Sequence, residues 1–323
     1  MHVLARMHLF AEGIMRKSWS QSTQSPERTF MEFLEFEEQL IECLKEKLSD
    51  EFELTIKDTL KNNGVKLRGV VLKRKGKNLA PTVYINSFYE EYIEGEEIAN
   101  IADEIINVSL KYALNDSINE ELFEDYEFLK DYIFVKLISI EKNVELLDEV
   151  PFVRFLDLAI VAYCEVSSFL NAKGTFLIKH EFLKKWNKSP QNVLEYAIEN
   201  TKKNLGCELI DLAEMLMHSK LIEEDECIPE EHIMHVLTNN TKQFGAVCMI
   251  YEDVISKYCD EIDSNVYVIP SSIHEVILIP SGVNPCYGNI NEMIQSVNET
   301  LPRGEILSDH AYYFSRSDGY EII

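Results

Sequence analysis

The sequence predicts an α+β protein, with an α/β fold as the alternative. Two observations carry this prediction: a helix and three short strands precede an acidic helical region, and strands then alternate with helices in the second half. With 323 residues, 46% of them hydrophobic and 27% charged, the chain is long enough for two folded domains. We therefore expect an N-terminal helix and meander with acidic helices, followed by a mixed sheet with packed helices.

The chain divides into three expected parts. Residues 1–30 form a basic and polar extension, 31–130 an N-terminal α+β domain, and 131–323 a C-terminal α/β-type mixed-sheet domain. The extension carries four Lys or Arg against two Glu, and its composition is compatible with disorder. Its apolar stretch is interrupted and no small-residue cleavage site follows, so we expect an extension, or an upstream in-frame start before a natural beginning near Met31, in place of a targeting signal.

The N-terminal domain begins with a helix. Apolar residues recur at helical spacing from Phe30 to Leu48. Residues 52–57 then alternate as a strand does, and Asn62-Asn63-Gly64 supplies hairpin turn chemistry. A second strand is expected over 65–74, and a third over 79–85, at a sheet edge because Pro81 cannot donate a backbone hydrogen bond.

Charge is segregated in this domain. Residues 57–77 hold eight Lys or Arg against one Asp, whereas residues 86–127 hold thirteen Asp or Glu against one Lys. A basic hairpin could dock an anion or a polynucleotide. We favour a solvated meander balanced by the acidic helices, because residues 57–77 contain no aromatic side chain on which bases could stack.

The C-terminal domain mixes both element types. A strand is predicted over Tyr132–Ile140, and the apolar segment Phe152–Val166 predicts either a central strand or a buried helix. Ser189-Pro190 opens a helix that reaches Asn204, with serine as N-cap and proline as the first helical residue. The other predicted elements are strands at 176–178, 234–237, 245–251, 266–269, 276–279 and 309–315, and helices at 252–261 and 289–300.

Composition excludes several function classes. A formal charge of −25, from 56 acidic against 31 basic side chains, opposes general binding to nucleic acid or to an anionic membrane. Seven cysteines without a C-x-x-C pair indicate reduced thiols in a cytosol. No apolar stretch approaches the ~18 residues of a spanning helix. We expect a soluble, cytoplasmic protein that does not contact membranes.

The candidate catalytic residues are Ser271, Ser272, His274, Glu275 and Asp309. The first four lie between two β-rich, proline-bounded runs. Adjacent side chains on a strand point to opposite faces, so His274 and Glu275 could act together only if the backbone bends there. Ser271 lacks the G-x-S-x-G elbow of an exposed nucleophile. We favour the interpretation that these polar groups satisfy backbone at a strand entrance.

Metal and cofactor motifs are weak. His232 and His235 have helical ligand spacing, but an H-E-x-x-H arrangement and a third ligand are missing. Walker A, G-x-G-x-x-G and D-x-D-x-D-G patterns are absent from the sequence. We therefore expect no cofactor and no metal.

A family resemblance rests on the second half of the chain. Its residues are Leu237-Thr238-Asn239 with Gly245-Ala246, the run Ile-Pro-Ser-Ser-Ile-His-Glu-Val-Ile-Leu-Ile-Pro at 269–280, and Leu307-Ser308-Asp309 with Tyr312. Together they resemble a family of gut Firmicutes proteins known as a domain of unknown function. The resemblance covers roughly residues 31–316, leaves out the extension, and implies no activity, cofactor or catalytic residue.

Three functions stay open at this stage. We favour a cytosolic bacterial interaction or regulatory module that binds a protein partner without catalysis. The first alternative is a hydrolase-like enzyme centred on Ser272, His274, Glu275 and Asp309. The second is nucleic-acid binding through the basic hairpin 57–77. Convergence of the four side chains in a pocket would favour the enzyme, and their burial against backbone would favour the module.

Overall fold

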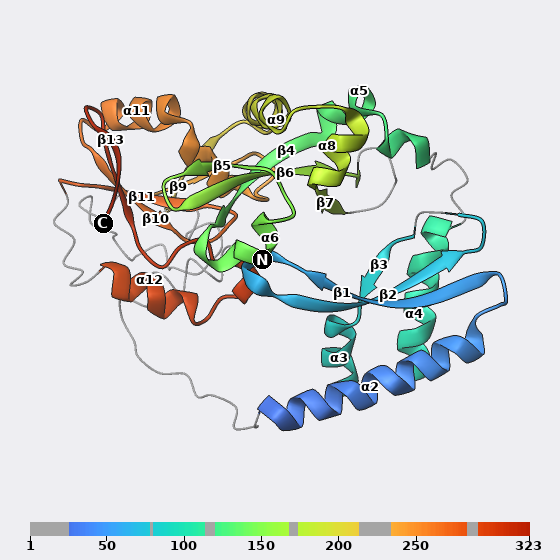
Figure 1. Ribbon diagram of the computed structural model, residues 1–323. Helices are drawn as coiled ribbons and strands as arrows, with labels where there is room; N and C mark the ends of the chain where they lie inside the picture. The colour runs from blue at the N-terminus through green and yellow to red at the C-terminus, as the bar shows by residue number, and fades with distance from the viewer. Residues whose placement is uncertain (1–25, 78–79, 114–119, 168–173, 213–233, 283–289) are drawn as a thin grey trace.

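The protein combines helices with three separate β-sheets, as the computed structural model shows (Figure 1). The predicted α+β class is confirmed. The strand pairs that the structure describes are all antiparallel, which differs from the predicted mixed sheet. The structure describes residues 26–77, 80–113, 120–167, 174–212, 234–282 and 290–323.

The first sheet has the order β1-β2-β3 and carries its helices on one face (Figure 1). Its elements are α2 (Pro26–Lys47), β1 (Phe52–Leu60), η1 (Asn62–Gly64), β2 (Lys66–Arg74), β3 (Thr82–Tyr84), α3 (Asn86–Ile93) and α4 (Ile98–Ala113). The predicted helix, hairpin turn and meander are thus confirmed. Phe36 and Leu40 of α2 are fully buried against Val70 of β2 and Ile101 and Ile105 of α4. This apolar stripe is what holds the helices on the sheet.

The second sheet is centred on β6, which pairs with β4 on one side and with β5 and β7 on the other. The β4 edge of this sheet is covered by α9: Thr201 Oγ1 accepts from Val135 N at 2.9 Å, and Asn200 Nδ2 donates to Ile133 O at 2.9 Å. The elements of this part are η2 (Glu120–Phe123), α5 (Tyr126–Leu129), η3 (Lys130–Tyr132), β4 (Ile133–Ser139), η4 (Glu141–Asn143), α6 (Val144–Leu147), β5 (Phe152–Phe155), β6 (Leu158–Glu165), β7 (Thr175–Leu177), α8 (His180–Trp186) and α9 (Pro190–Leu205).

The third sheet has the order β13-β12-β10-β11-β9-β8. One face of this sheet shares a large core with β4, β6 and α9, to which it contributes Val268, Leu278 and Tyr312. The elements are β8 (Glu208–Asp211), β9 (His235–Thr238), η6 (Gly245–Ile250), α11 (Glu252–Glu261), β10 (Val266–Pro270), β11 (Val276–Pro280), α12 (Ile290–Asn298), η7 (Arg303–Glu305), β12 (Tyr312–Ser315) and β13 (Gly319–Ile322).

Two predicted elements differ in the structure. The segment Phe152–Val166 is neither one strand nor a helix but the β5–β6 hairpin, which turns at Leu156 with φ 57°. The strand expected at 245–251 is the 3₁₀ helix η6 instead. Its residues from Gly245 to Met249 are buried on all sides, so the apolar run carries no periodicity that separates a strand from a helix.

Asparagines join the first sheet to the other two. Asn63, which has φ 57° in the β1–β2 turn, exchanges hydrogen bonds with Asn143: Asn63 N donates to Oδ1 at 2.7 Å, and Asn143 Nδ2 donates to Asn63 Oδ1 at 2.9 Å. Asn63 Nδ2 also donates to the carbonyls of Arg303 and Ile306 at 2.8 and 2.6 Å. Segment 303–306 is thereby fixed beside the β10–β11 connection, where Ile273 N donates to Glu305 O at 2.9 Å.

None of the helices in the described ranges is both long enough and apolar enough to cross a membrane.

Candidate functional site

The predicted serine, histidine and glutamate lie in the five-residue connection between β10 and β11. Strand β11 begins at Val276 and not at Ile273, so the backbone bends here. The bend lets Ser272 Oγ donate to Glu275 Oε1 at 2.7 Å while it accepts from His274 N at 2.9 Å. Ser272 is 0% exposed and Glu275 2% exposed. The hydroxyl is therefore engaged on both sides and shielded from solvent.

His274 connects this turn to the loop that precedes η6. Its Nδ1 accepts from Phe244 N at 3.1 Å, and its ring stacks on the Phe244 ring with centroids 5.6 Å apart and planes 14° apart. Thr238 Oγ1 donates to the His274 carbonyl at 2.8 Å. Because Nδ1 is an acceptor, this hydrogen bond is compatible with a neutral imidazole that carries its proton on Nε2.

The loop that meets His274 has a strained backbone. Lys242 and Phe244 both adopt left-handed conformations, with φ 56° and 57°, which side chains of this size rarely do. The next residue, 245, must be glycine, because a Cβ there would lie 2.6 Å from both Asn239 N and His274 O. The Asn239 side chain closes the loop by accepting from Thr241 N and Gln243 N and donating to Gln243 O. This backbone conformation places the Phe244 ring against the His274 ring.

Asp309 does not join this cluster. Its carboxylate pairs with Lys142 Nζ at 2.6 Å and accepts from Asn298 Nδ2 at 2.8 Å. Ser271 is buried at 6% exposure beside the cluster. The structure thus brings Ser272, Glu275 and the His274 backbone together, directs the His274 ring toward Phe244, and leaves Asp309 with separate contacts.

Only one of the two metal candidates lies in the part of the chain that the structure describes. His235 lies on β9, and its Nδ1 is 2.9 Å from the hydroxyl of Tyr258. His232 falls outside the described residues. Within the described ranges, no cluster of three or more His, Cys, Asp or Glu side chains has the geometry to hold a metal ion.

The basic hairpin is partly neutralised by its own domain. Arg68 binds Glu37 of α2 and Asp58 of β1, at 2.8 and 3.0 Å. These bonds raise the pKa of the Arg68 guanidinium further, the Glu37 hydrogen bond most. Lys73 pairs with Glu53 of β1, and Arg74 pairs with Glu51, the residue before β1. The carboxylates that pair with Arg68, Lys73 and Arg74 therefore come from residues 37–58.

Lys136 was not predicted from the sequence. It lies on β4 opposite Val161, with its ammonium 4.5 Å from the centre of the Phe244 ring. Burial, and then the nearby charge of Lys61, lower the pKa of this amine to about 8. The available signal was a lone lysine inside the otherwise apolar run 133–138.

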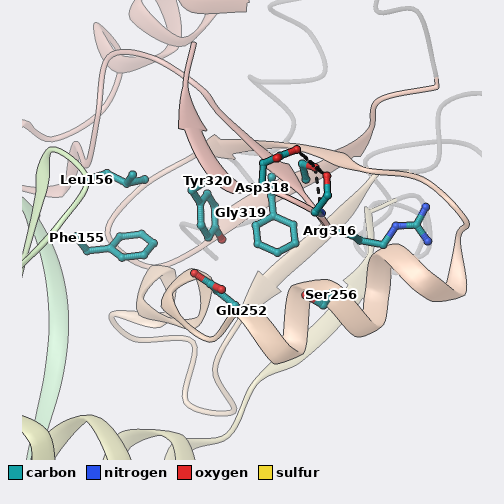
Figure 2. Close-up of a pocket in the computed structure, with 11 residues that line it drawn as sticks. Phe155, Leu156, Glu252, Ser256, Arg316, Asp318, Gly319 and Tyr320 are labelled. Atoms are coloured by element: carbon teal, nitrogen blue, oxygen red, sulfur yellow. Dashed lines mark hydrogen bonds between the residues drawn. The ribbon is translucent and has the colours of Figure 1, made fainter.

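A surface pocket of about 450 Å³ lies between the β5–β6 turn, α11 and the β12–β13 hairpin (Figure 2). Figure 2 shows Glu252 pointing from α11 toward Phe155 and Tyr320, whereas the Arg316 guanidinium points away. Rings make the apolar wall: Tyr320 packs edge-to-face on Phe155 at 5.3 Å and on Phe314 at 4.9 Å. Sequence reasoning missed this pocket because its walls come from three separated segments.

Two carboxylates, Glu252 and Asp318, line this pocket together with three serines and with Arg316, whose guanidinium points away. Asp318 accepts from the hydroxyl of Ser317 at 2.6 Å, and Arg316 is paired with Asp260 and Asp263 outside the cavity. Glu252 stands in the first turn of α11 and has no hydrogen-bond or ion-pair partner in the part of the chain that the structure describes. The pocket therefore offers a carboxylate beside aromatic rings.

Fold and site together define an antiparallel α+β protein with a buried, hydrogen-bonded Ser-His-Glu turn and a surface pocket lined by carboxylates and aromatic rings. The chain belongs to a family of unknown function, DUF5688, whose model matches residues 33–316. This confirms the membership in a family of unknown function that the motif at 269–280 predicted. Neither a curated protein nor a solved structure gives a significant match.

Proposed function

We propose that the protein is a cytoplasmic interaction module without catalysis, and that it binds a basic segment of a protein partner. The observation that carries the proposal is the Glu252 carboxylate, which faces the pocket without a pairing group among the described residues. An arginine or lysine side chain of the partner enters the pocket, pairs with Glu252 and lies against Tyr320. The chain's charge of −25 draws such a segment toward it.

The chemistry of the pocket suits a cation. A guanidinium or ammonium gains from the face of an aromatic ring and from a carboxylate at the same time. Apolar side chains on the two flanking edge strands extend the surface beyond the pocket: Phe152 and Val153 of β5 are 42% and 40% exposed, and Ile322 of β13 is 45% exposed. A partner segment has contacts available on both sides of its anchoring residue.

Burial of the Ser-His-Glu turn favours the module over the hydrolase alternative. A nucleophilic serine needs access to substrate and a base that takes its proton. The Ser272 hydroxyl is fully buried, and its proton is directed at Glu275 inside a four-residue turn. The hydrogen bonds of this turn instead support a structural role for the cluster.

The test is a titration of the full chain with a fluorescein-labelled hexa-arginine peptide at physiological salt, followed by anisotropy. We expect Glu252→Gln to weaken binding about tenfold, since one ion pair beside a ring is lost. The matched control is Glu261→Gln, which makes the same charge change at the other end of α11, where Glu261 is exposed. We expect less than a twofold change for this control. Equal losses in both variants would show attraction by bulk charge alone and would overturn the proposal.

A further inference from the structure

The thiol of Cys248 lies against the short connection between α9 and β8. Cys248 belongs to η6 and is fully buried. Its thiol donates to Thr238 O of β9 at 3.2 Å, and Gly206 O, at 3.6 Å, is a second acceptor within its reach. The Gly206 carbonyl is part of the peptide bond that leads into Cys207. The Cys248 sulfur therefore contacts the backbone beside a second cysteine.

The strand register places Cys207 beside the same sulfur by a separate route. Glu208, the residue after Cys207, lies opposite Thr238 in the β8–β9 pair. The Cys248 thiol thus contacts the carbonyl before Cys207 and the strand partner of the residue after it. Because a carbonyl oxygen lies about 2.8 Å from the next Cα, the Cys207 Cα is no more than about 6.5 Å from this sulfur. The Cys207 side chain also packs on the core cluster that contains Cys248.

The two thiols differ in acidity and in exposure. A hydrogen bond with Cys248 lowers the pKa of the Cys207 thiol; burial opposes this shift, and the positive charge of Lys202 adds to it. The same hydrogen bond, and then burial, raise the pKa of the Cys248 thiol. Cys207 is partly exposed, whereas Cys248 is buried. The pair thus combines an accessible, more acidic thiol with a sheltered second thiol.

Other cysteines of the described ranges provide internal references. Burial raises the pKa of the Cys164 thiol to about 12 and that of the Cys259 thiol to about 11, which keeps both protonated and unreactive. Cys43 is partly exposed, as Cys207 is, and packs against the apolar core of the first sheet. Among the described members of that core there is no second cysteine. Cys43 is therefore the matched reference for Cys207.

We propose that Cys207 and Cys248 form a redox-active dithiol, which a small-molecule disulfide such as oxidised glutathione converts into an intramolecular disulfide. The Cys207 thiolate attacks one sulfur of the oxidant RSSR, which forms Cys207–S–S–R and releases RS⁻. This RS⁻ takes up the proton that Cys207 had lost to water. Cys248 then attacks the Cys207 sulfur, its proton passes to the second departing RS⁻, and RSH leaves. Two protein thiols are oxidised, and one RSSR is reduced to two RSH.

The disulfide would join the start of β8 to η6. The residue before η6 is Phe244, on whose ring His274 stacks, and η6 leads through Tyr251 into α11. Oxidation therefore adds a covalent link next to the loop that meets the β10–β11 connection. In a reducing cytosol the dithiol stays open, and an oxidant closes it. The dithiol shares no residue with the Glu252 pocket, so either proposal can fail alone.

The first test needs no variant and maps the disulfides of the wild-type full chain after incubation with oxidised glutathione at pH 7.5. Remaining thiols are blocked with N-ethylmaleimide, and the chain is digested with trypsin without reduction. Cleavage after lysine gives peptides 204–220 and 243–257, which hold one cysteine each. We expect these two peptides to be linked about tenfold more often than any other pair of cysteine peptides. A linked yield no higher than that of the other pairs overturns the proposal.

The second test separates the roles of the two thiols. We expect Cys248→Ala to stop at a mixed disulfide between Cys207 and glutathione, whereas the control Cys43→Ser still forms the internal link. In a short pulse of N-ethylmaleimide, Cys207 of the wild type is modified several-fold faster than Cys43, and Cys248→Ala loses most of this advantage. Equal labelling of Cys207 and Cys43 in the wild type contradicts the proposal even if a variant fails to fold.

Discussion

Lys136 is a charged residue on a strand face that is otherwise apolar, and its cost to the fold depends on pH. On folding, the Lys136 amine loses hydration and is repelled by the charge of Lys61. In return it gains the contact with the Phe244 ring. Lost hydration and repulsion both disfavour the charged form, so the folded pKa falls to about 8 from its ordinary value near 10.5. Between these two values the unfolded chain binds a proton that the folded chain does not.

We expect Lys136→Met to stabilise the protein at pH 7 and to lose that advantage as the pH rises. Below pH 8 the folded chain carries the desolvated charge, so the wild type has the full cost; from about 8 to 10.5 the cost disappears because the folded amine is neutral. The free energy of unfolding of both proteins is measured with urea in chloride buffers at pH 7, 8.5 and 10. A difference that stays constant over this range would contradict the shifted titration of Lys136.

Sequence reasoning about single residues reached only their near neighbours along the chain. The polar residues at 271–275 were expected to satisfy backbone, and Ser272 does accept from His274 N. The bond from Phe244 N to His274 Nδ1 joins residues 30 positions apart. Only the folded chain brings these two residues together, so pattern and spacing within the sequence could not indicate that contact.

At the scale of elements, regular strands and helices with clear end signals could be predicted. Ser189 Oγ accepts from Asn192 N at the start of α9, as the Ser-Pro pair indicated, and the β1–β2 turn forms at Asn62-Asn63-Gly64. Segments buried on every side could not be assigned, because burial removes the alternation on which the prediction depends. Helix η6 and the β5–β6 hairpin are the two examples.

Gly245 is the residue that lets the strained loop reach His274. A Cβ at this position would lie 2.1 Å from Thr238 Oγ1 and 2.6 Å from two backbone atoms, and backbone cannot yield as a flexible side chain does. We expect Gly245→Ala to lower the free energy of unfolding by about 3 kcal/mol, at the upper end for an overpacked site.

The matched control for that substitution is Gly282→Ala. A Cβ there meets nothing closer than Ser264 Oγ at 3.9 Å. Urea unfolding of both variants beside the wild type measures the two effects. If Gly245→Ala lowers the free energy of unfolding no more than Gly282→Ala does, the loop can move to accept the added Cβ. That result would contradict the tight contact between residues 238–246 and 271–275.

At the scale of the whole molecule, the three sheets meet through polar side chains and not only through apolar cores. The Asn63 and Asn143 pair and the carbonyls of segment 303–306 join the first sheet to the others, and the same segment supports the β10–β11 connection. Lys142 pairs with Asp309 near this junction. A hydrolase triad with Asp309 would need that carboxylate for His274, whereas the junction uses it for Lys142 and Asn298.

The division of the chain at residue 130 stays a prediction. Residues on both sides of it contribute to the asparagine junction, so separate folding of the two parts is not implied by their separate sheets. The acidic pocket lies wholly after residue 150, so the proposed binding to it does not draw on residues of the first sheet.

The central claim is that Ser272, His274 and Glu275 hold two loops together and do not perform chemistry. The most direct measurement is reaction of the folded full chain with a fluorophosphonate, an electrophile that modifies activated serine hydroxyls, followed by peptide mapping. We expect no adduct at Ser271 or Ser272, because both side chains are buried and the Ser272 hydroxyl is bound to Glu275. An adduct at either serine that disappears in His274→Ala, while that variant remains folded, would contradict the claim.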